Sequence, residues 1–320
     1  MARILVVGGV GYIGSHVVSL LMEAGHEVTV FDNLSTGLQA NLFSENRLIV
    51  GDICKEIDIF SAMEGQDAVM HFAAKKAVAE SMENPAKYAR NNLIGTLNLL
   101  NAMDHHGVKY LVFSSSAAVY GMPDVSVVDE NTPVNPINFY GFTKAEIEKC
   151  LQWYDRLCDI KFVALRYFNA VGYDMNRRSR GHEANPQNLL PIIIEVAEGK
   201  REKLKIFGDD YPTPDGTCIR DYVHVCDLAQ AHLLALDKLM NGMDSQILNL
   251  GTEKGTSVKE MVTAVEEVLG KKLNVEIAPR REGDPACLVA SAEKARKILG
   301  WKPQITDLHQ IVKSALPEDL

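Results

Sequence analysis

The sequence lacks several features that would place the protein in a specialised class. Its six cysteines are scattered without a CxxC pair, so neither a disulfide framework nor a zinc site is indicated, and no metal is expected. No apolar run approaches the roughly 18 residues that a membrane-spanning helix needs. Positive charge is not in excess, because 33 Lys and Arg against 42 Asp and Glu give a net charge of −9. Nucleic acid and an anionic membrane surface are therefore not expected as partners.

The composition that remains is that of an ordinary globular protein. Of 320 residues, 47% are hydrophobic and 23% are charged, which excludes a disordered or low-complexity chain. Residues 3–7 mimic the start of a signal peptide, but they lead into glycines without a small-residue cleavage site. Together with the unpaired cysteines, this predicts a cytoplasmic protein. The length suits about two domains or one large α/β unit, and the 23 glycines require an explanation.

In the first half of the chain, short aliphatic and β-branched runs alternate with longer segments of helical periodicity. This alternation predicts βαβ units, and therefore an α/β fold with a doubly wound, Rossmann-type parallel sheet covered by helices on both faces. The predicted strands are residues 4–7, 28–31, 48–50, 68–72, 110–113 and 162–166, and the predicted helices are 13–24, 85–103 and 143–157.

After about residue 170 the regular alternation ends, which predicts a smaller α+β unit. Residues 173–185, with Arg177, Arg178 and Arg180, are expected to form an exposed loop, and residues 208–216 form a second loop around Tyr211. Helices are predicted at 189–198, 227–239, 257–269 and 292–299, with a buried strand at 247–250 that could return to the main sheet.

Three of the glycines are explained by a turn between a strand and a helix. Gly8, Gly11 and Gly14 follow the first predicted strand and open the first predicted helix, a context that lets the backbone approach a pyrophosphate at the helix N-terminus. Asp32 closes the second strand, where a carboxylate would hold the adenosine ribose hydroxyls and repel a 2′-phosphate. The pattern therefore predicts NAD rather than NADP. Asp52, at the end of the third strand, suits either the adenine or a helix cap.

A tyrosine and a lysine are placed one helical turn apart. Tyr140 and Lys144 would share a face of the helix 143–157, extended by a turn, and a lysine cation lowers the pKa of a neighbouring phenol from its ordinary value of about 10. Ser114, Ser115 and Ser116 end a predicted strand at the edge of the sheet where such folds bind ligands. The combination indicates acid–base chemistry on a substrate hydroxyl.

At this point the sequence resembles the extended short-chain dehydrogenase/reductase family, in particular its UDP-hexose 4-epimerases. The resemblance covers nearly the whole chain, including the C-terminal part, which matters because the Rossmann half alone is shared by many chemistries. It is carried by residues 8–16, 32–34, 51–53, 71–81, 91–92, 114–121, 140–144, 166–169, 206–208, 216–225, 280–284 and 300–301.

The resemblance implies a role for each matching residue. Tyr140 would be the catalytic acid and base, Ser116 would hydrogen-bond the same substrate oxygen, and Lys144 would bind the nicotinamide ribose and tune Tyr140. The NAD site would be lined by Gly8, Gly11, Tyr12, Ile13, Gly14, Asp32, Asn33, Asp52, Ile53, Phe72, Ala73, Lys76, Asn91, Tyr140, Lys144 and Phe168. The UDP-sugar would contact Ser116, Tyr140, Asn169, Asn188, Leu189, Phe207, Arg220, Arg281 and Asp284, whose arginines suit a diphosphate.

The activity implied is that of an isomerase of galactose metabolism. It would epimerise a UDP-hexose at C4, UDP-galactose to UDP-glucose and back, through a transient 4-keto sugar. The alternatives are a nucleotide-sugar dehydratase, a decarboxylase acting on UDP-glucuronate, or a non-catalytic NAD-sensing regulator. Dehydratases of the superfamily carry an Asp-Glu pair directly after the catalytic serine or threonine, where this chain has Ala117 and Ala118. Regulators commonly lose the YxxxK pair, which this chain keeps.

The domain division, substrate breadth and assembly also follow from the resemblance. Residues 1–170 would form the NAD-binding Rossmann domain, with 217–252 returning to its sheet, and residues 171–216 and 253–320 would bind the UDP-sugar. Leu288 lies where a bulky residue would exclude an N-acetyl group and is intermediate in size, which leaves N-acetylated UDP-hexosamines as candidate substrates. The helices 85–103 and 143–157 would pair with a second subunit in a homodimer, although burial of their apolar faces within one chain is equally compatible.

Overall fold

The computed structural model describes residues 1–42, 47–176, 178–179, 181, 183, 186–281 and 283–316. Within these residues, seven parallel strands form one sheet in the order β11-β7-β5-β4-β1-β2-β3. The strands are β1 (Arg3–Val7), β2 (Glu27–Asp32), β3 (Arg47–Val50), β4 (Ala68–His71), β5 (Tyr110–Ser114), β7 (Lys161–Tyr167) and β11 (Gln246–Leu250). The order runs outward from β1 in both directions, which is the doubly wound Rossmann arrangement. The predicted α/β fold class is confirmed.

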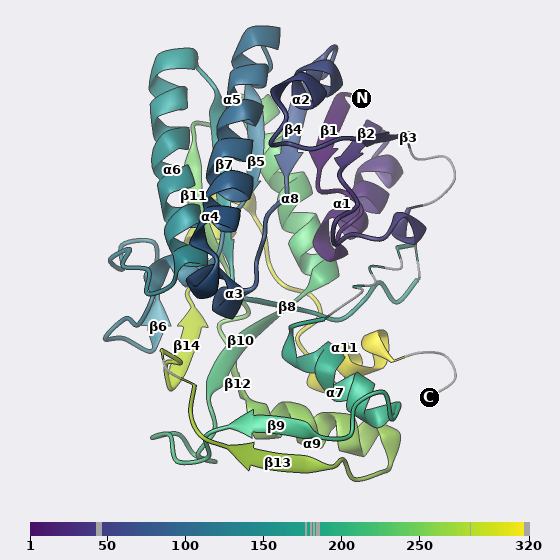
Figure 1. Ribbon diagram of the computed structural model, residues 1–320, viewed down its shortest axis with the longest axis vertical. Coiled ribbons are helices and arrows are strands. Elements are labelled where there is room, and N and C mark those ends of the chain that lie inside the picture. The colour runs from purple at the N-terminus through teal and green to yellow at the C-terminus, as the bar shows by residue number, and fades with distance from the viewer. Residues whose placement is uncertain are drawn as a thin grey trace.

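Helices cover both faces of this sheet (Figure 1). On one face lie α1 (Tyr12–Glu23) and α8 (Val225–Met240), and on the other lie α2 (Glu56–Met63), α5 (Gly95–His106) and α6 (Phe139–Cys158). Successive residues of one strand are therefore buried in different cores: Val6 belongs to the first and Leu5 to the second, and both are fully buried. This double burial explains why the strands are continuously apolar. None of the helices in the described part of the chain has the length and hydropathy that a membrane span requires.

The helix predicted over residues 85–103 is present but is divided into three pieces. Asn84 caps it, accepting a hydrogen bond from the Lys87 backbone N–H at 3.2 Å, and Pro85 occupies the first turn. The pieces are α4 (Pro85–Tyr88), a π-helical segment η2 (Ala89–Ile94) and α5, and α4 is preceded by the short α3 (Val78–Glu83). Such π turns occur frequently at functional sites, and this one contains Asn91.

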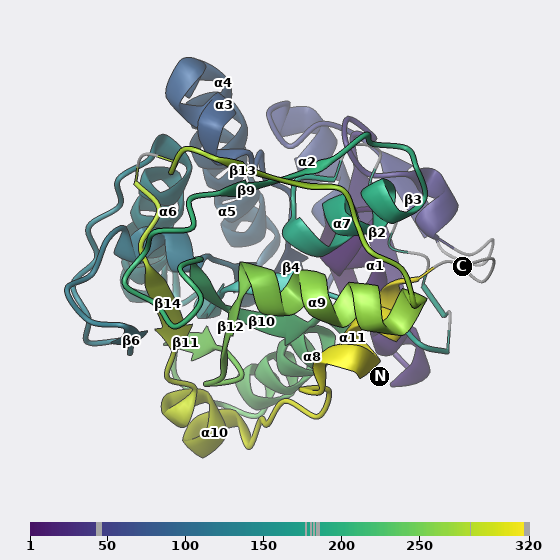
Figure 2. The same ribbon diagram turned by 90° about the horizontal axis from the view of Figure 1, so that it is seen from below.

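The C-terminal part is a smaller α+β unit below the main sheet (Figure 1). Figure 2, seen from below, brings its helices and its two-stranded ribbon toward the viewer. Its larger sheet contains β12 (Gly255–Ser257), β10 (Ile219–His224), β14 (Cys287–Ala290) and β6 (Val127–Val128), with β8 (Asn169–Val171) beside β10. The ribbon pairs β13 (Val275–Ala278) with β9 (Leu204–Phe207), and the helices are α7 (Leu189–Ala197), α9 (Val258–Leu269), α10 (Glu293–Leu299) and α11 (Leu308–Ala315).

The chain crosses between the two parts more than once. β10 belongs to the smaller sheet, but the following α8 packs against α1, and β11 pairs in parallel with β7 at the edge of the main sheet. The main sheet therefore contains the strand predicted at 247–250. Several elements of the smaller unit were not predicted, among them β9, β10, β13 and α11. The short strands β9 and β13 alternate more buried with more exposed positions, β10 contains the charged Arg220 and Asp221, and α11 has only eight residues.

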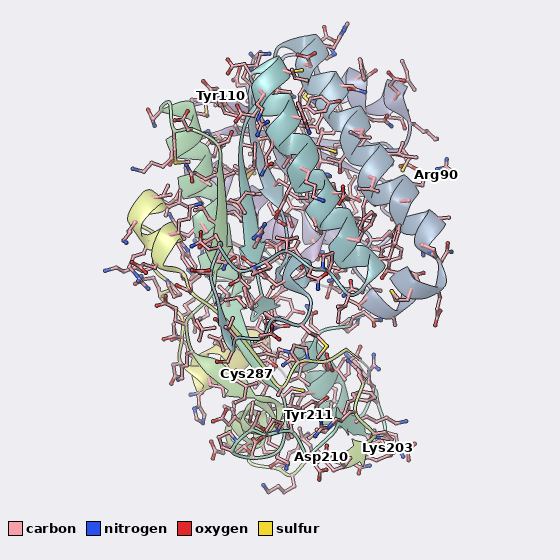
Figure 3. The ribbon with its side chains drawn as sticks, turned by 90° about the vertical axis from the view of Figure 1, so that its left-hand side faces the viewer. Arg90, Tyr110, Lys203, Asp210, Tyr211 and Cys287 are labelled. Atoms are coloured by element: carbon pink, nitrogen blue, oxygen red, sulfur yellow. The ribbon has the colours of Figure 1, made fainter. Side chains whose placement is uncertain are left out.

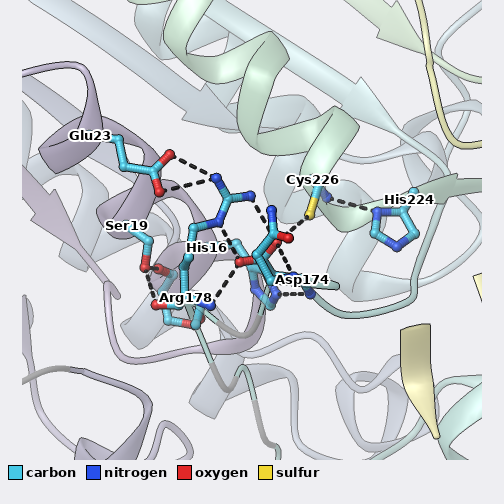
Figure 4. Close-up of polar contacts among 10 residues, drawn as sticks. His16, Ser19, Glu23, Asp174, Arg178, His224 and Cys226 are labelled. Atoms are coloured by element: carbon cyan, nitrogen blue, oxygen red, sulfur yellow. Dashed lines mark hydrogen bonds and ion pairs between the residues drawn. The ribbon is translucent and has the colours of Figure 1, made fainter. Parts of the chain in front are cut away.

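The prediction that residues 173–185 form an exposed loop is wrong for much of the described part. Asp174 and Ser179 are buried, and the segment is bonded to α1 (Figure 4). The Ser19 hydroxyl donates to the Arg178 carbonyl oxygen at 2.9 Å, while the Arg178 guanidinium bridges Asp174 and Glu23. Arg177 and Arg180 lie outside the described residues. The polar sequence is compatible with burial because its charges find partners within the fold.

Residues 208–216 form the predicted loop, yet its central side chain is not exposed. Tyr211 is buried, and the Arg280 guanidinium lies 4.2 Å from the centre of its ring and also pairs with Asp210. Figure 3 shows Asp210, Tyr211 and Cys287 in the C-terminal part, well separated from Arg90 of η2. The loop is thus a folded component of the smaller unit.

Candidate active site

The glycine turn between β1 and α1 is sterically closed to larger residues. Gly8 has φ +85°, and a Cβ there would lie 2.5 Å from the backbone nitrogen of Ala73. A Cβ on Gly14 would lie 2.3 Å from the carbonyl oxygen of Gly8, so the helix can approach the strand only without one. Gly11 is the N-cap of α1, and no side chain caps that helix. The first-turn N–H groups of Tyr12 and Ile13 are thus suited to a phosphate, and the turn fits a dinucleotide.

Asp32 lies at the carboxyl end of β2, beside the turn. Its carboxylate accepts hydrogen bonds from the backbone N–H of Val10 at 3.3 Å and of Leu34 at 2.9 Å. Burial raises the pKa of Asp32, and these backbone donors oppose the rise. The neighbouring Asn33 accepts a hydrogen bond from the Ser35 backbone N–H at 3.0 Å. A carboxylate held in this position fits ribose hydroxyls.

A cavity of about 460 Å³ opens next to Asp32. It brings together Asn33, Asp52 and Asn91, which come from three separate segments and were all predicted to line the NAD site. Sequence reasoning missed its cationic wall, which is formed by Lys75, Lys87 and Arg90; the wall also includes Cys54, Asn84 and Ala86. The KK pair at 75–76 is the available signal, but it does not indicate which lysine faces the cavity.

The structure also separates the two interpretations of Asp52. The N-cap of α2 is Lys55, so Asp52 does not cap that helix; its carboxylate accepts a hydrogen bond from the Cys54 backbone N–H at 2.9 Å and faces the cavity. The side chain of Ile53, by contrast, is buried in the core, where a Cβ on Gly95 would lie 2.7 Å from it. Ile53 can therefore offer a ligand its backbone but little of its side chain.

The remaining residues predicted to line the NAD site lie farther along the same edge of the sheet. Phe72 and Ala73 follow β4, and both backbone N–H groups donate to the carbonyl oxygen of Val7. Lys76 forms an ion pair with Glu183 of the segment that follows β8. Phe168 lies between β7 and β8 and packs against a small cluster around Tyr120.

Tyr140, Ser116 and Lys144 converge at the carboxyl end of β5. Tyr140 is in the first turn of α6, and its phenol is close enough to the Ser116 side chain for that side chain to lower its pKa. The Lys144 ammonium donates to the Ser114 carbonyl oxygen at 2.7 Å and lies 5.9 Å from the Tyr140 ring. Sequence spacing thus correctly predicted that one helix would present both groups to the serine run.

The protonation balance differs from the expectation in one respect. Burial raises the pKa of Tyr140, and the bond to Ser116 only partly opposes it. Burial also lowers the pKa of Lys144 to about 7, against the opposing charge of Glu148. The ammonium is directed to the Ser114 carbonyl oxygen, and the net shift of the Tyr140 pKa is upward, opposite to the lowering that the sequence predicted.

The residues predicted to bind the UDP-sugar form two pairs and a helix start. The Arg220 guanidinium donates to the Pro285 carbonyl oxygen at 2.7 Å and pairs with Asp284 at 3.4 Å. The Arg281 guanidinium lies 3.8 Å from the centre of the Phe207 ring. Asn188 and Leu189 begin α7, whose N-terminus has no side-chain cap, and Asn169 opens β8 with its amide bonded to the Asp221 carbonyl oxygen.

Comparison with known proteins identifies the family. The family model described as the NAD dependent epimerase/dehydratase family matches residues 4–251. The chain belongs to this family. It is 50% identical over 317 residues to the UDP-glucose 4-epimerase of Streptococcus mutans, covering 98% of this chain and 95% of that protein.

Solved structures agree with the family assignment. The fold matches the crystal structure of UDP-glucose 4-epimerase from Brucella ovis in complex with NAD, with a TM-score of 0.96, 42% identity and coverage of 99% and 98% of the two chains. It also matches the UDP-Glc/GlcNAc 4-epimerase of Campylobacter jejuni, with a TM-score of 0.86, 41% identity and 98% of each chain covered. The Rossmann-type architecture and the NAD dependence of the family thus agree with the glycine turn and Asp32.

Proposed function

We propose that the protein is an NAD-dependent epimerase that interconverts UDP-galactose and UDP-glucose through a transient 4-keto sugar. The observation that carries the proposal is the convergence of Tyr140, Ser116 and Lys144 on one point of the sheet edge. The similarity to curated UDP-glucose 4-epimerases over nearly the whole chain supports the substrate class.

Each catalytic group has one task in the proposed reaction. The Tyr140 oxygen takes the proton of the sugar 4-hydroxyl and later returns it, while Ser116 holds the same substrate oxygen by a hydrogen bond. Lys144, charged and fixed on the Ser114 carbonyl oxygen, stabilises the phenolate form of Tyr140. NAD, when bound, supplies the chemistry of accepting and returning the C4 hydride. Inversion requires the 4-keto sugar to turn over in the site before it is reduced on its other face.

The remaining predicted residues would hold the two ligands. The glycine turn, Asp32 and the cavity around Asn33, Asp52 and Asn91 would hold the dinucleotide. Arg220, Arg281 and Asp284 would anchor the UDP so that the sugar can turn while its nucleotide stays in place. We assign residues 1–170 and 217–252 mainly to cofactor binding and residues 171–216 and 253–320 to the UDP-sugar. The exception is β10, which carries Arg220 and belongs to the smaller sheet, so we assign it to the UDP-sugar as well.

The alternative chemistries find less support at the same site. Ala117 and Ala118 occupy the positions after Ser116 and start the short 3₁₀ helix η3 (Ala117–Tyr120), so they offer no acid or base for dehydration. Retention of Tyr140, Lys144 and Ser116 in hydrogen-bonding positions argues against a non-catalytic regulator.

A direct assay tests the proposal. Purified protein incubated with UDP-galactose, without added nucleotide, is expected to form UDP-glucose. The Tyr140→Phe variant should lose about 10²- to 10⁴-fold in kcat, because the phenol carries the proton transfer. Tyr154→Phe is the matched control, since Tyr154 is on the same helix but bonds Asn101 outside the site. NAD bound to an inactive wild type would contradict the proposal and favour the regulator.

Substrate breadth and assembly extend the proposal. Leu288 pairs with Arg220 across β14 and β10, which supports a place for Leu288 beside the sugar. UDP-N-acetylglucosamine is therefore proposed as a further substrate, and Leu288→Tyr should exclude it.

The neighbouring α5 and α6 expose Leu97, Trp153 and Leu157, which supports a homodimer built on these helices. A monomer by light scattering would contradict that assembly. The six free cysteines support a cytoplasmic location, testable by fractionation of the source cells. A role in galactose metabolism follows from the proposed substrates.

A further inference from the structure

One face of α6 contains a third polar residue that the proposed reaction does not use. Tyr140, Lys144 and Glu148 follow one another at four-residue spacing, so they lie on the same side of the helix. Each contacts a different member of the serine run at the end of β5. The Tyr140 phenol lies beside the Ser116 side chain, the Lys144 ammonium donates to the Ser114 carbonyl oxygen, and Glu148 accepts a hydrogen bond from the Ser115 hydroxyl at 2.5 Å.

Glu148 is held in place by a buried arginine from the next strand. Arg166 of β7 donates from Nε to one carboxylate oxygen at 2.9 Å and from Nη2 to the other at 2.5 Å. Both side chains are at most 5% exposed. The remaining guanidinium nitrogen Nη1 donates to the Tyr120 hydroxyl at 3.0 Å, and that hydroxyl donates to the Asn249 side chain at 2.7 Å. A bidentate pair of this kind fixes geometry as well as charge.

The network places the negative charge of Glu148, which is paired with Arg166, one helical turn from Lys144. Burial lowers the pKa of Lys144 to about 7, and the charge of Glu148 acts against this. Burial would also lower the pKa of Arg166, but its bonds to Glu148 raise it above the ordinary value. The groups that interact with Lys144 are Tyr140 and Glu148 on α6, His71 at the end of β4, and Phe113 and Ser114 on β5. From β7, Arg166 pairs with Glu148, and the Tyr167 hydroxyl is bonded to the Ser114 side chain. Burial, reinforced by Lys144, lowers the pKa of His71 to about 3, so His71 is neutral near pH 7.

We propose that Glu148, clamped by Arg166, is a positioning residue that keeps Lys144 charged and holds the serine run so that Ser116 meets Tyr140. The proposal rests on the proposed epimerase function and deepens it. In the proposed arrangement Glu148 contacts neither NAD nor the UDP-sugar, and it acts through Lys144 and Ser115. Its removal is expected to affect the reaction step more than substrate binding, since the UDP anchors Arg220 and Arg281 belong to the other part of the molecule.

The test compares the pH profiles of two opposite charge changes. In Glu148→Gln the protonated form of Lys144 is lost at lower pH, so the alkaline limb of kcat/KM should move down by about one pH unit. In Arg166→Gln the positive charge that pairs with the Glu148 carboxylate is removed, so the same alkaline limb should move to higher pH. Glu148→Gln should also lower kcat on the order of tenfold or more, with little change in KM for UDP-galactose. Glu146→Gln is the matched control, because Glu146 lies on the same helix and pairs with Lys149 at the surface.

The outcomes separate this inference from the proposed function. An inactive wild type contradicts the epimerase itself. If the wild type is active, the role of Glu148 is overturned when the alkaline limbs of both variants coincide with that of the wild type. It is also overturned when both limbs move in the same direction. Bound NAD per chain and the melting temperature, measured for every variant, report whether the site and fold persist. If a single variant fails to fold, the double variant Glu148→Gln/Arg166→Gln leaves no unpaired charge. The alkaline limb of the double variant should lie at a lower pH than that of the wild type but at a higher pH than that of Glu148→Gln. A limb at the wild-type pH would overturn the proposal.

Discussion

At the scale of single residues, the site depends on small changes of geometry. Gly8 and Gly25 both have a φ near +80°, but only Gly8 is surrounded: a Cβ on Gly25 would meet nothing within 4 Å, whereas one on Gly8 would meet the backbone of Ala73. The two glycines therefore separate the conformational cost of a side chain at positive φ from the steric cost of closing the turn.

Gly8→Ala should lower the free energy of unfolding by more than Gly25→Ala does. Positive φ alone costs roughly 1–2 kcal/mol for alanine, which is the whole effect expected at Gly25. At Gly8 the clash with Ala73 adds about 1–3 kcal/mol and displaces the turn. Urea unfolding of both variants measures the difference, and NAD retained after gel filtration should fall only in Gly8→Ala. Equal losses of stability would show that the Ala73 backbone yields without cost.

At the scale of secondary-structure elements, local sequence signals account for many helix ends. Ser257 caps α9 in a capping box: its hydroxyl oxygen accepts from the Glu260 backbone N–H at 3.0 Å, and the Glu260 carboxylate accepts from the Ser257 backbone N–H at 2.6 Å. The same hydroxyl donates to Asp215 of the loop 208–216. The cap thus joins the helix to the loop.

Ser257→Ala should destabilise the protein more than removal of a simple cap. Asp307 caps α11 through the Gln310 backbone N–H alone, at an exposed position, and Asp307→Ala should cost about 1 kcal/mol. Ser257→Ala also deprives the Asp215 carboxylate of a donor, so a loss nearer 2 kcal/mol is expected. Chemical denaturation of both variants provides the measurement, and a smaller loss in Ser257→Ala would contradict the coupling to the loop.

At the scale of the whole molecule, buried histidines occur on both sides of the contact between the two parts. Burial lowers the pKa of His16, His224 and His232 to about 4, and that of His71 to about 3. His16 on α1 contacts the segment after β8 through the Asp174 backbone N–H, and His224 ends β10. The folded molecule thus excludes protons that its unfolded chain would bind near pH 5.

Stability should therefore decrease as the pH falls from about 6.5 toward 4. Between these values the unfolded histidines are protonated and the folded ones are not, so the unfolded state binds more protons and gains from acid. Each such histidine contributes a slope of up to about 1.4 kcal/mol per pH unit. Urea unfolding from pH 4.5 to 8 should show this slope, and His232→Leu should reduce it. Parallel curves for the variant and the wild type would contradict the burial argument.

The sequence predicted the main sheet closely and the smaller unit poorly. Strands such as residues 4–7 and 247–250 were found to within one residue at either end, because burial on both faces leaves an unbroken apolar run. Among the described residues the strands β9 and β13 pair only with each other, so each has exposed positions and a mixed pattern. The prediction of an exposed loop failed at residues 173–181 for a different reason. Their charges suggested exposure, but Asp174 and Arg178 pair with each other in the fold.

By itself, the sequence determined the features that local backbone geometry encodes. These are the alternation of strands and helices, the glycine turn with Asp32, and the spacing of Tyr140 and Lys144. Only the tertiary structure decided which other distant groups meet: Glu148 with Arg166, and the cations of the cavity with Asp52. The physical reason is that periodicity and turn chemistry act over a few neighbouring residues, whereas contacts between elements, and the burial that shifts the pKa of Lys144, arise only when the elements pack.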